Sequence, residues 1–116
     1  MADYMDAMST QDLQDGQMKA VELKGNDILV ARSGDQFYAA SNVCPHMKAR
    51  LSGGTLDGSI VSCPRHASRF DLRDGHVVRW TDWSGLKFAL VKMFRSPRPL
   101  PTYKTRVEGD RLKIEV

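Results

Sequence analysis

The sequence predicts an all-β fold, a small antiparallel barrel or sandwich that forms one domain. Short runs of strand-forming residues recur about every eight to twelve residues over most of the chain, and turn residues separate them. The chain has 116 residues, of which 41% are hydrophobic. That is enough for one modest core and too little for a second domain of any size. We therefore expect a single domain over residues 1–116.

The predicted strands are bounded by turns. Residues 28–31 form a continuous apolar run typical of a buried strand, and the turn 33–35 leads out of it. Residues 71–75 and 108–110 favour hairpin turns. The strands predicted in this way are 18–23, 28–31, 36–41, 59–62, 76–80, 103–107 and 111–116, with loops at 44–54 and from 63 to 70.

The segment between residues 80 and 97 has a different periodicity. Phe88 and Val91 lie off its main apolar face, so a helix here would be apolar on two sides. An alternating strand pattern fits less of the segment, and we predict a short helix. It either covers one end of the barrel or forms a docking or self-association surface. The residues that fill one helical face are Leu86, Ala89, Leu90, Met93 and Phe94.

Composition and charge exclude several classes of function. Seventeen Lys and Arg against fourteen Asp and Glu give a net charge of +3, too small a surplus to indicate nucleic-acid binding without a matching motif. No apolar run approaches the roughly 18 residues that span a bilayer. The polar start MADYMDAMSTQDLQDG has no features of an export signal. We therefore expect a cytoplasmic protein with reduced thiols and neither a membrane nor a nucleic-acid partner.

Two short Cys/His turns carry the chemistry of the sequence. Cys44-Pro45-His46 is followed, after sixteen intervening residues, by Cys63-Pro64-Arg65-His66. Both cysteines of the chain and two of its three histidines lie in these turns. A single buried cysteine or a single histidine is usually structural, but two matched turns predict a metal centre.

The residue types fit two kinds of metal centre. Two thiolates and two imidazoles suit tetrahedral zinc. They also suit a [2Fe-2S] cluster with both cysteines on one iron and both histidines on the other. Zinc fingers usually pair Cys with Cys and His with His, whereas each turn here supplies one of each. This order favours the iron–sulfur cluster and leaves zinc open.

The same turns lie in sequences that resemble the cluster loops of Rieske ferredoxins. NVCPH at residues 42–46, followed by LSGG at 51–54, resembles the first loop, and CPRHASRFD at 63–71 resembles the second. DLQDG at 12–16, PLPTY at 99–103 and the final hairpin are similar too. The resemblance covers nearly the whole chain except about 81–96, which we interpret as an insertion.

The resemblance implies an all-β Rieske fold, with a cluster-binding subdomain at about 42–71 on an antiparallel base. It implies that Cys44 and Cys63 hold the inner iron of one [2Fe-2S] cluster. His46 and His66 would hold the outer, solvent-facing iron.

Four positions bear on the reduction potential. Respiratory Rieske proteins have a loop-bridging disulfide where this chain has Ala49 and Arg65. Ser68 occupies the position of a serine that donates to sulfur in those proteins, but Phe70 stands where they have a tyrosine. Hydrogen bonds to sulfur stabilise the reduced cluster. We therefore predict a midpoint in the lower part of the Rieske range of roughly −150 to +300 mV, with Ser68 raising it.

The resemblance implies an electron carrier that is not itself an enzyme. It would pass electrons from a flavin-dependent reductase to an oxygenase or another terminal redox enzyme. A Rieske oxygenase also needs a second iron held by two histidines and a carboxylate. Only His76 remains here, and we interpret it as a surface residue. Two alternatives stay open: a small Rieske subunit of a larger reductase such as assimilatory nitrite reductase, and a zinc module for protein interaction.

The cluster loops are rich in basic residues. Asp57 is the one acidic residue between positions 42 and 70. Basic loops predict an acidic docking face on the partner and an electron-transfer rate that falls with salt. The alternative is an ordinary solvated surface. The basic residues are Lys48, Arg50, Arg65 and Arg69.

Overall fold

The computed structural model describes residues 4–43, 50–64, 68–79 and 99–116, and these form an all-β fold, as predicted. The elements are β1 (Tyr4–Ser9), the 3-10 helix η1 (Thr10–Asp12), β2 (Met18–Leu23), β3 (Asn26–Ser33), β4 (Gln36–Ser41), the 3-10 helix η2 (Leu51–Gly53), β5 (Thr55–Asp57), β6 (Ile60–Ser62), β7 (Arg69–Asp71), β8 (Val77–Arg79), β9 (Thr102–Tyr103), β10 (Thr105–Glu108) and β11 (Arg111–Glu115).

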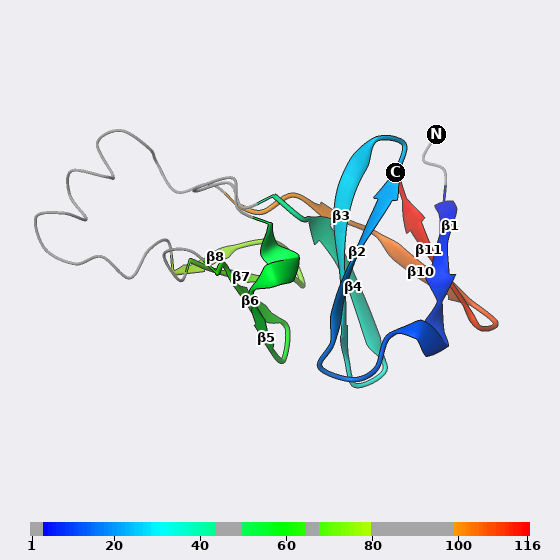
Figure 1. Ribbon diagram of the computed structural model, residues 1–116, viewed down its shortest axis with the longest axis horizontal. Helices are drawn as coiled ribbons and strands as arrows, with labels where there is room; N and C mark the ends of the chain where they lie inside the picture. The colour runs from blue at the N-terminus through cyan, green and yellow to red at the C-terminus, as the bar shows by residue number, and fades with distance from the viewer. Residues whose placement is uncertain (1–3, 44–49, 65–67, 80–98) are drawn as a thin grey trace, which may run out of the picture.

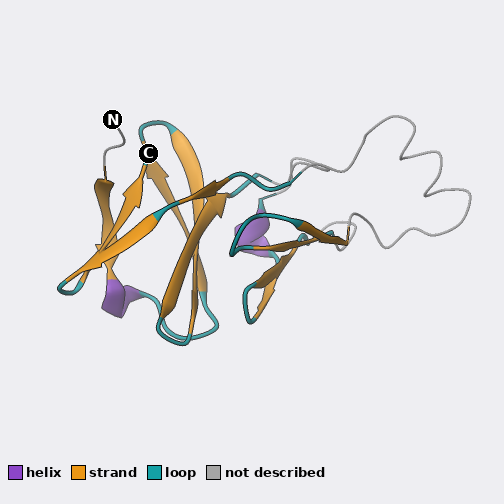
Figure 2. Cartoon of the chain, turned by 180° about the vertical axis from the view of Figure 1, so that it is seen from behind, coloured by secondary structure: helices purple, strands orange, loops and turns teal. Residues whose placement is uncertain are grey.

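The strands form three antiparallel sheets. The central sheet has the order β2-β3-β4-β9, and a second sheet, β1-β11-β10, joins the two ends of the chain. The second sheet lies on one side of the central sheet, and the third sheet, β5-β6-β7-β8, lies on the other (Figure 1). Figure 2 shows the same arrangement from behind, with the third sheet set apart as a smaller lobe.

Strand β3 contributes to two hydrophobic clusters because its sheet is the middle layer. Leu29 and Ala31 pack in a cluster with residues of the third sheet, whereas Ile28 and Val30 pack in a cluster with residues of β1 and β11. All four side chains are fully buried. Successive side chains of a strand point to opposite faces. A strand buried on both faces therefore needs the continuous apolar run that the sequence shows.

Several strands differ from those predicted. β1 and β5 were not predicted, and β7 consists of the last two residues of the predicted loop, Arg69 and Phe70, and the first residue of the predicted turn, Asp71. The predicted strand 103–107 is divided at Lys104, because β9 pairs with the central sheet and β10 with the second sheet. The strand expected at 76–80 begins at Val77. β5 and β7 have only three residues each and give no readable alternation, whereas β1 depends on pairing with β11 near the other end of the chain.

The predicted helical insertion at about 81–96 lies outside the described residues. The described chain that follows it is held to the rest of the fold. The Leu100 N–H donates to the carbonyl of Gly75 at 2.8 Å, and the Ser41 N–H donates to the carbonyl of Pro101 at 2.8 Å. Within the described ranges, no helix has the length and apolar character needed to cross a membrane.

Candidate metal centre

The first predicted cluster loop leaves the central sheet at Asn42 and is closed at its base. Val43 forms an isolated antiparallel bridge with Arg50, and the Leu51 N–H donates to the carbonyl of Asn42 at 2.7 Å. Positions 44–49, which include Cys44 and His46, lie between these paired residues in the sequence and outside the described part of the chain. The structure therefore fixes the two ends of the loop that carries the first Cys/His turn.

Asn42 is fully buried and bonds through both atoms of its side-chain amide. Its Nδ2 donates to Oδ1 of Asp27 and to Oγ of Ser52, both at 3.1 Å, and its Oδ1 accepts from the Ser52 N–H at 2.7 Å. Arg50 donates to the same Asp27 carboxylate from Nε at 3.1 Å and from Nη2 at 3.3 Å. These bonds hold the pKa of Asp27 below its usual range, chiefly through Arg50.

The second predicted cluster loop is the tip of the β6–β7 hairpin. Val61 pairs with Phe70 and Ser62 with Arg69, and the Cys63 N–H then donates to the carbonyl of Ser68 at 2.7 Å. The four residues 64–67 follow this last pair, and the predicted ligand His66 is among those not described. Cys63 thus lies where the hairpin ladder ends and the loop begins.

The bases of the two loops lie against each other. A Cβ on Gly54, just after η2, would overlap the carbonyl oxygen of Ser62, so only glycine allows this approach. A Cβ on Gly53 would lie 3.9 Å from Cγ of Pro64. The end of the first loop is therefore in contact with the start of the second, as a centre with ligands from both loops requires.

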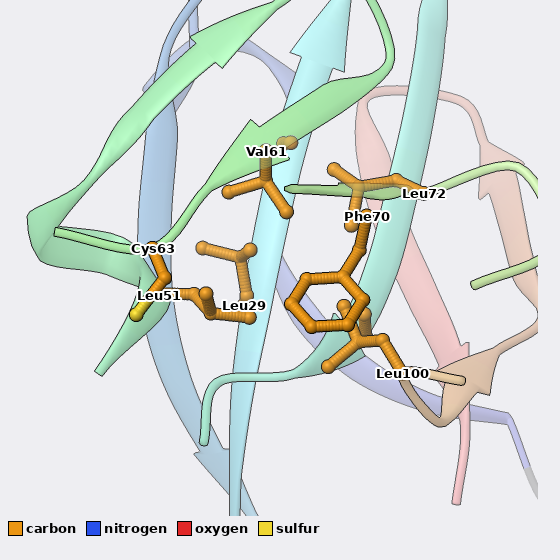
Figure 3. Close-up of a cluster of buried hydrophobic side chains, with 9 residues drawn as sticks. Leu29, Leu51, Val61, Cys63, Phe70, Leu72 and Leu100 are labelled. Carbon is orange, nitrogen blue, oxygen red and sulfur yellow. The ribbon is translucent and has the colours of Figure 1, made fainter. Parts of the chain in front are cut away.

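Cys63 is buried, with 4% of its surface exposed, at the edge of the cluster shared by the central and third sheets. Figure 3 shows it beside Leu51, with Phe70 and Leu100 on the other side of the cluster. A thiol in this position is shielded from water on its protein side and directly precedes residues 64–67 of the second loop in the sequence. That environment suits a sulfur ligand to an inner metal ion.

Ser68 and Phe70, the residues predicted to lie around the cluster, are both fully buried. Phe70 packs in the same hydrophobic cluster as Cys63, and Ser68 shares a backbone hydrogen bond with Cys63. Both therefore lie close to this cysteine along the hairpin. The bonding of the Ser68 hydroxyl to a cluster sulfur stays a prediction.

The predicted basic residues do not share one environment. Arg50 forms an ion pair with Asp27, although 65% of its side chain is exposed. Arg69 is exposed on β7. Lys48 and Arg65 lie outside the described residues. Sequence reasoning missed Asp27, because it stands 23 positions before Arg50 and belongs to another strand.

A buried carboxylate fixes the turn after β7. Asp71 accepts hydrogen bonds from Nη2 of Arg73 at 2.7 Å, from the Arg73 N–H at 3.0 Å and from Oγ of Ser59 at 3.0 Å. The bonds from the Arg73 side chain are the main cause that holds the pKa of Asp71 far below its usual range. His76 is exposed, as predicted, and its Nδ1 lies 2.6 Å from Oδ1 of Asp74.

The described residues fit the predicted centre but contain only one of its four ligands, Cys63. Cys44, His46 and His66 lie outside them. Among the residues that are described, no group of three His, Cys, Asp or Glu could hold a metal ion. The fit therefore rests on two loops of suitable composition, each closed at its base, that meet beside a buried thiol.

Comparison with known families and proteins agrees with a cluster held by the two Cys/His loops. The family model for the Rieske [2Fe-2S] domain matches residues 3–103. The ferredoxin component of a naphthalene 1,2-dioxygenase system from Pseudomonas aeruginosa is 26% identical over 113 residues, which are 97% of this chain and 95% of that protein.

Solved structures extend the similarity to the fold. The complex of reduced oxygenase and oxidized ferredoxin in carbazole 1,9a-dioxygenase contains a chain with a TM-score of 0.77 and 29% identity, over 97% of this chain and 92% of that one. A chain assigned as the small subunit of an NADH-dependent nitrite reductase from Mycobacterium tuberculosis has a TM-score of 0.78 and 22% identity. The match spans all of this chain and 96% of that one. At 22% identity, the match to the nitrite reductase chain supports a shared fold alone.

Proposed function

Because the chain belongs to the Rieske [2Fe-2S] domain family, we propose that it is a one-electron carrier that passes electrons from a reductase to an oxygenase or other terminal redox enzyme. The observation that carries this proposal is the match over 97% of the chain to a ferredoxin component of a dioxygenase system. Such components are carriers and not catalytic subunits. The bound [2Fe-2S] cluster supplies reversible one-electron chemistry.

In this proposal the two loops hold the cluster within a subdomain at about 42–71. Cys44 and Cys63 bind the inner iron, and His46 and His66 bind the outer iron. The burial of Cys63 and the contact between the loop bases support this assignment. A cytoplasmic location belongs to the same proposal, since both cysteines are required as thiolates and a reducing compartment keeps them so.

The assignment of partners follows the relatives. The related carbazole dioxygenase ferredoxin is found in a complex with its oxygenase. We assign this chain an oxygenase-type acceptor and a reductase donor. A role as the small subunit of a nitrite reductase is the second candidate, and the similarity to such a chain is one of fold alone. A ferredoxin would be purified without its partners, whereas a permanent subunit would be recovered with a larger one.

The experiment that tests the function is a redox titration of anaerobically purified protein, with EPR of the reduced state. We expect one [2Fe-2S] cluster per chain and a rhombic signal with the low average g value of an imidazole-ligated cluster. Turnover of a dioxygenase by reductase and oxygenase components should then depend on this protein. A colourless, zinc-loaded protein without an EPR signal would exclude the electron-transfer function.

A further inference from the structure

The first cluster loop is connected to the central sheet through one carboxylate. Asp27, on β3, is the hydrogen-bond acceptor for Asn42 on one side of the loop and for Arg50 on the other. The backbone repeats this link, because the Asn42 N–H donates to the Asp27 carbonyl at 2.9 Å. Asn42 also bonds Ser52, the second residue after Arg50.

These contacts surround the ligand-bearing segment in the sequence. Cys44 is two residues after Asn42, and His46 is four residues before Arg50. Both ends of the loop are thus hydrogen-bonded to the same side chain, that of Asp27. The next two residues of β3, Ile28 and Leu29, are fully buried. A carboxylate that accepts from both ends restricts how far the ends can separate.

We propose that Asp27 and Arg50 are positioning residues that hold the first loop in the geometry needed to retain the cluster. This inference rests on the proposed function, and it gives Arg50 a role in supporting the base of the first loop in addition to its predicted role in partner docking. Asp27 and Arg50 do not touch the iron ions in this proposal. They act through Asn42 and through the loop base, by limiting the motion of Cys44 and His46.

The chain contains a matched control for this pair. Asp6 on β1 accepts from Arg111 on β11 at 2.9 Å from Nε and at 2.7 Å from Nη2. This is also a two-bond carboxylate–guanidinium pair at a partly exposed position, with side-chain exposures of 51% and 44%. It lies in the sheet that contains neither cluster loop. Its loss should weaken the fold without affecting the loop.

The experiment measures the rate at which the loaded protein loses its visible cluster absorbance to an excess of an iron chelator. Asp27→Asn and Arg50→Gln are each expected to accelerate the loss by roughly fivefold, the effect of removing a partly exposed charged hydrogen bond. The double variant should be no faster than Asp27→Asn alone, because both changes break one interaction. Asp6→Asn should release its cluster at the wild-type rate.

EPR and urea unfolding distinguish positioning from general stability. We expect broadened EPR features in Asp27→Asn and Arg50→Gln, and unchanged features in Asp6→Asn even if its urea midpoint falls. The inference is overturned if both loop variants keep their cluster as long as wild type, or if Asp6→Asn loses it equally fast. Iron and sulfide are assayed first in the wild-type protein. Their absence would reject the proposed function itself, whereas their presence with unaltered variants would reject this inference alone.

Should Asp27→Asn fail to fold, Arg50→Gln decides the outcome, because the Arg50 side chain is mostly exposed and its removal leaves the core unchanged. Arg50→Lys adds a further measurement. A lysine retains the charge but cannot donate two parallel hydrogen bonds, so we expect a release rate between those of wild type and Arg50→Gln.

Discussion

Gly54 shows how one residue controls the approach of the two cluster loops. Its backbone lies so close to Ser62 that a Cβ would overlap the carbonyl oxygen there. We therefore expect Gly54→Ala to lower the free energy of unfolding by about 3 kcal/mol, the upper range for overpacking, and to reduce cluster content. Urea denaturation and iron analysis of the purified variant measure these two effects.

Gly53→Ala is the matched control for that substitution. A Cβ at Gly53 would meet Cγ of Pro64 at 3.9 Å, an ordinary van der Waals distance. Gly53→Ala should therefore stay close to wild type in stability and iron content. Equal losses in both variants would mean that the close contact with Ser62 is not what makes position 54 sensitive.

The reduction potential should change when the single hydroxyl of Ser68 is removed. It is fully buried and paired through its backbone with the predicted ligand Cys63. If the hydroxyl donates to a cluster sulfur, Ser68→Ala lowers the midpoint potential by roughly 50 mV, the equivalent of one hydrogen bond in a one-electron step. Protein-film voltammetry measures the shift. Ser33→Ala, at the end of β3, is the control, and an unchanged Ser68→Ala potential would show that the hydroxyl is bonded elsewhere.

The turn between β7 and β8 depends on a buried carboxylate. The pKa of Asp71 is held far below its usual range, chiefly by Arg73, so the charged form stabilises the folded state. This stabilisation is complete above the unfolded-state pKa of about 4 and is lost as the pH falls toward the folded-state value. Asp71→Asn should therefore cost roughly 2 kcal/mol at pH 7, and less as the pH is lowered below 4.

The measurement is urea unfolding at several pH values between 3 and 7. Asp57→Asn serves as the control, because Asp57 is an exposed carboxylate on β5 of the same sheet. We expect its stability to follow wild type at every pH. A difference between Asp71→Asn and wild type that stays constant down to pH 3 would contradict the assignment of the effect to ionised Asp71.

The elements also show which parts of the fold the sequence could predict. The continuous apolar run of β3 and the turn at 33–35 between β3 and β4 were readable, because each is a local pattern. β1 was not, because its pairing with β11 joins the two ends of the chain and its own pattern buries only Met8. β5 and β7, of three residues each, exist through their pairing with β6.

Some parts of the candidate site could likewise be predicted from the sequence, and others could not. The Cys/His turns were recognisable because chemistry fixes both residue type and spacing. The role of Asp27 was not, since its partners Asn42 and Arg50 come from a distant segment. Arg50 was predicted as a docking residue from its place in a basic loop, and only the fold reveals the carboxylate beside it. The docking role of Lys48, Arg50, Arg65 and Arg69 stays a prediction.

The net charge of +3 and the basic loops affect how the protein associates with a partner. A [2Fe-2S] cluster with two thiolate and two neutral imidazole ligands is close to neutral when oxidised, so the surrounding side chains determine the docking field. We expect the second-order rate of electron transfer to the oxygenase to fall as salt rises above about 0.1 M, where the screening length is roughly 10 Å. Stopped-flow absorbance at several ionic strengths measures the rate.

Variants locate the charges that cause this dependence. Arg69→Gln, and Lys48→Gln in the first loop, should each lower the rate at low salt by about threefold and flatten its salt dependence. Arg106→Gln on β10, a mostly exposed arginine of the sheet without cluster loops, should leave the slope nearly unchanged. A rate that does not vary with salt in the wild-type protein would mean that the loop charges serve solubility alone. A slope lowered equally by Arg106→Gln would mean that total charge matters and that the cluster loops have no special part in docking.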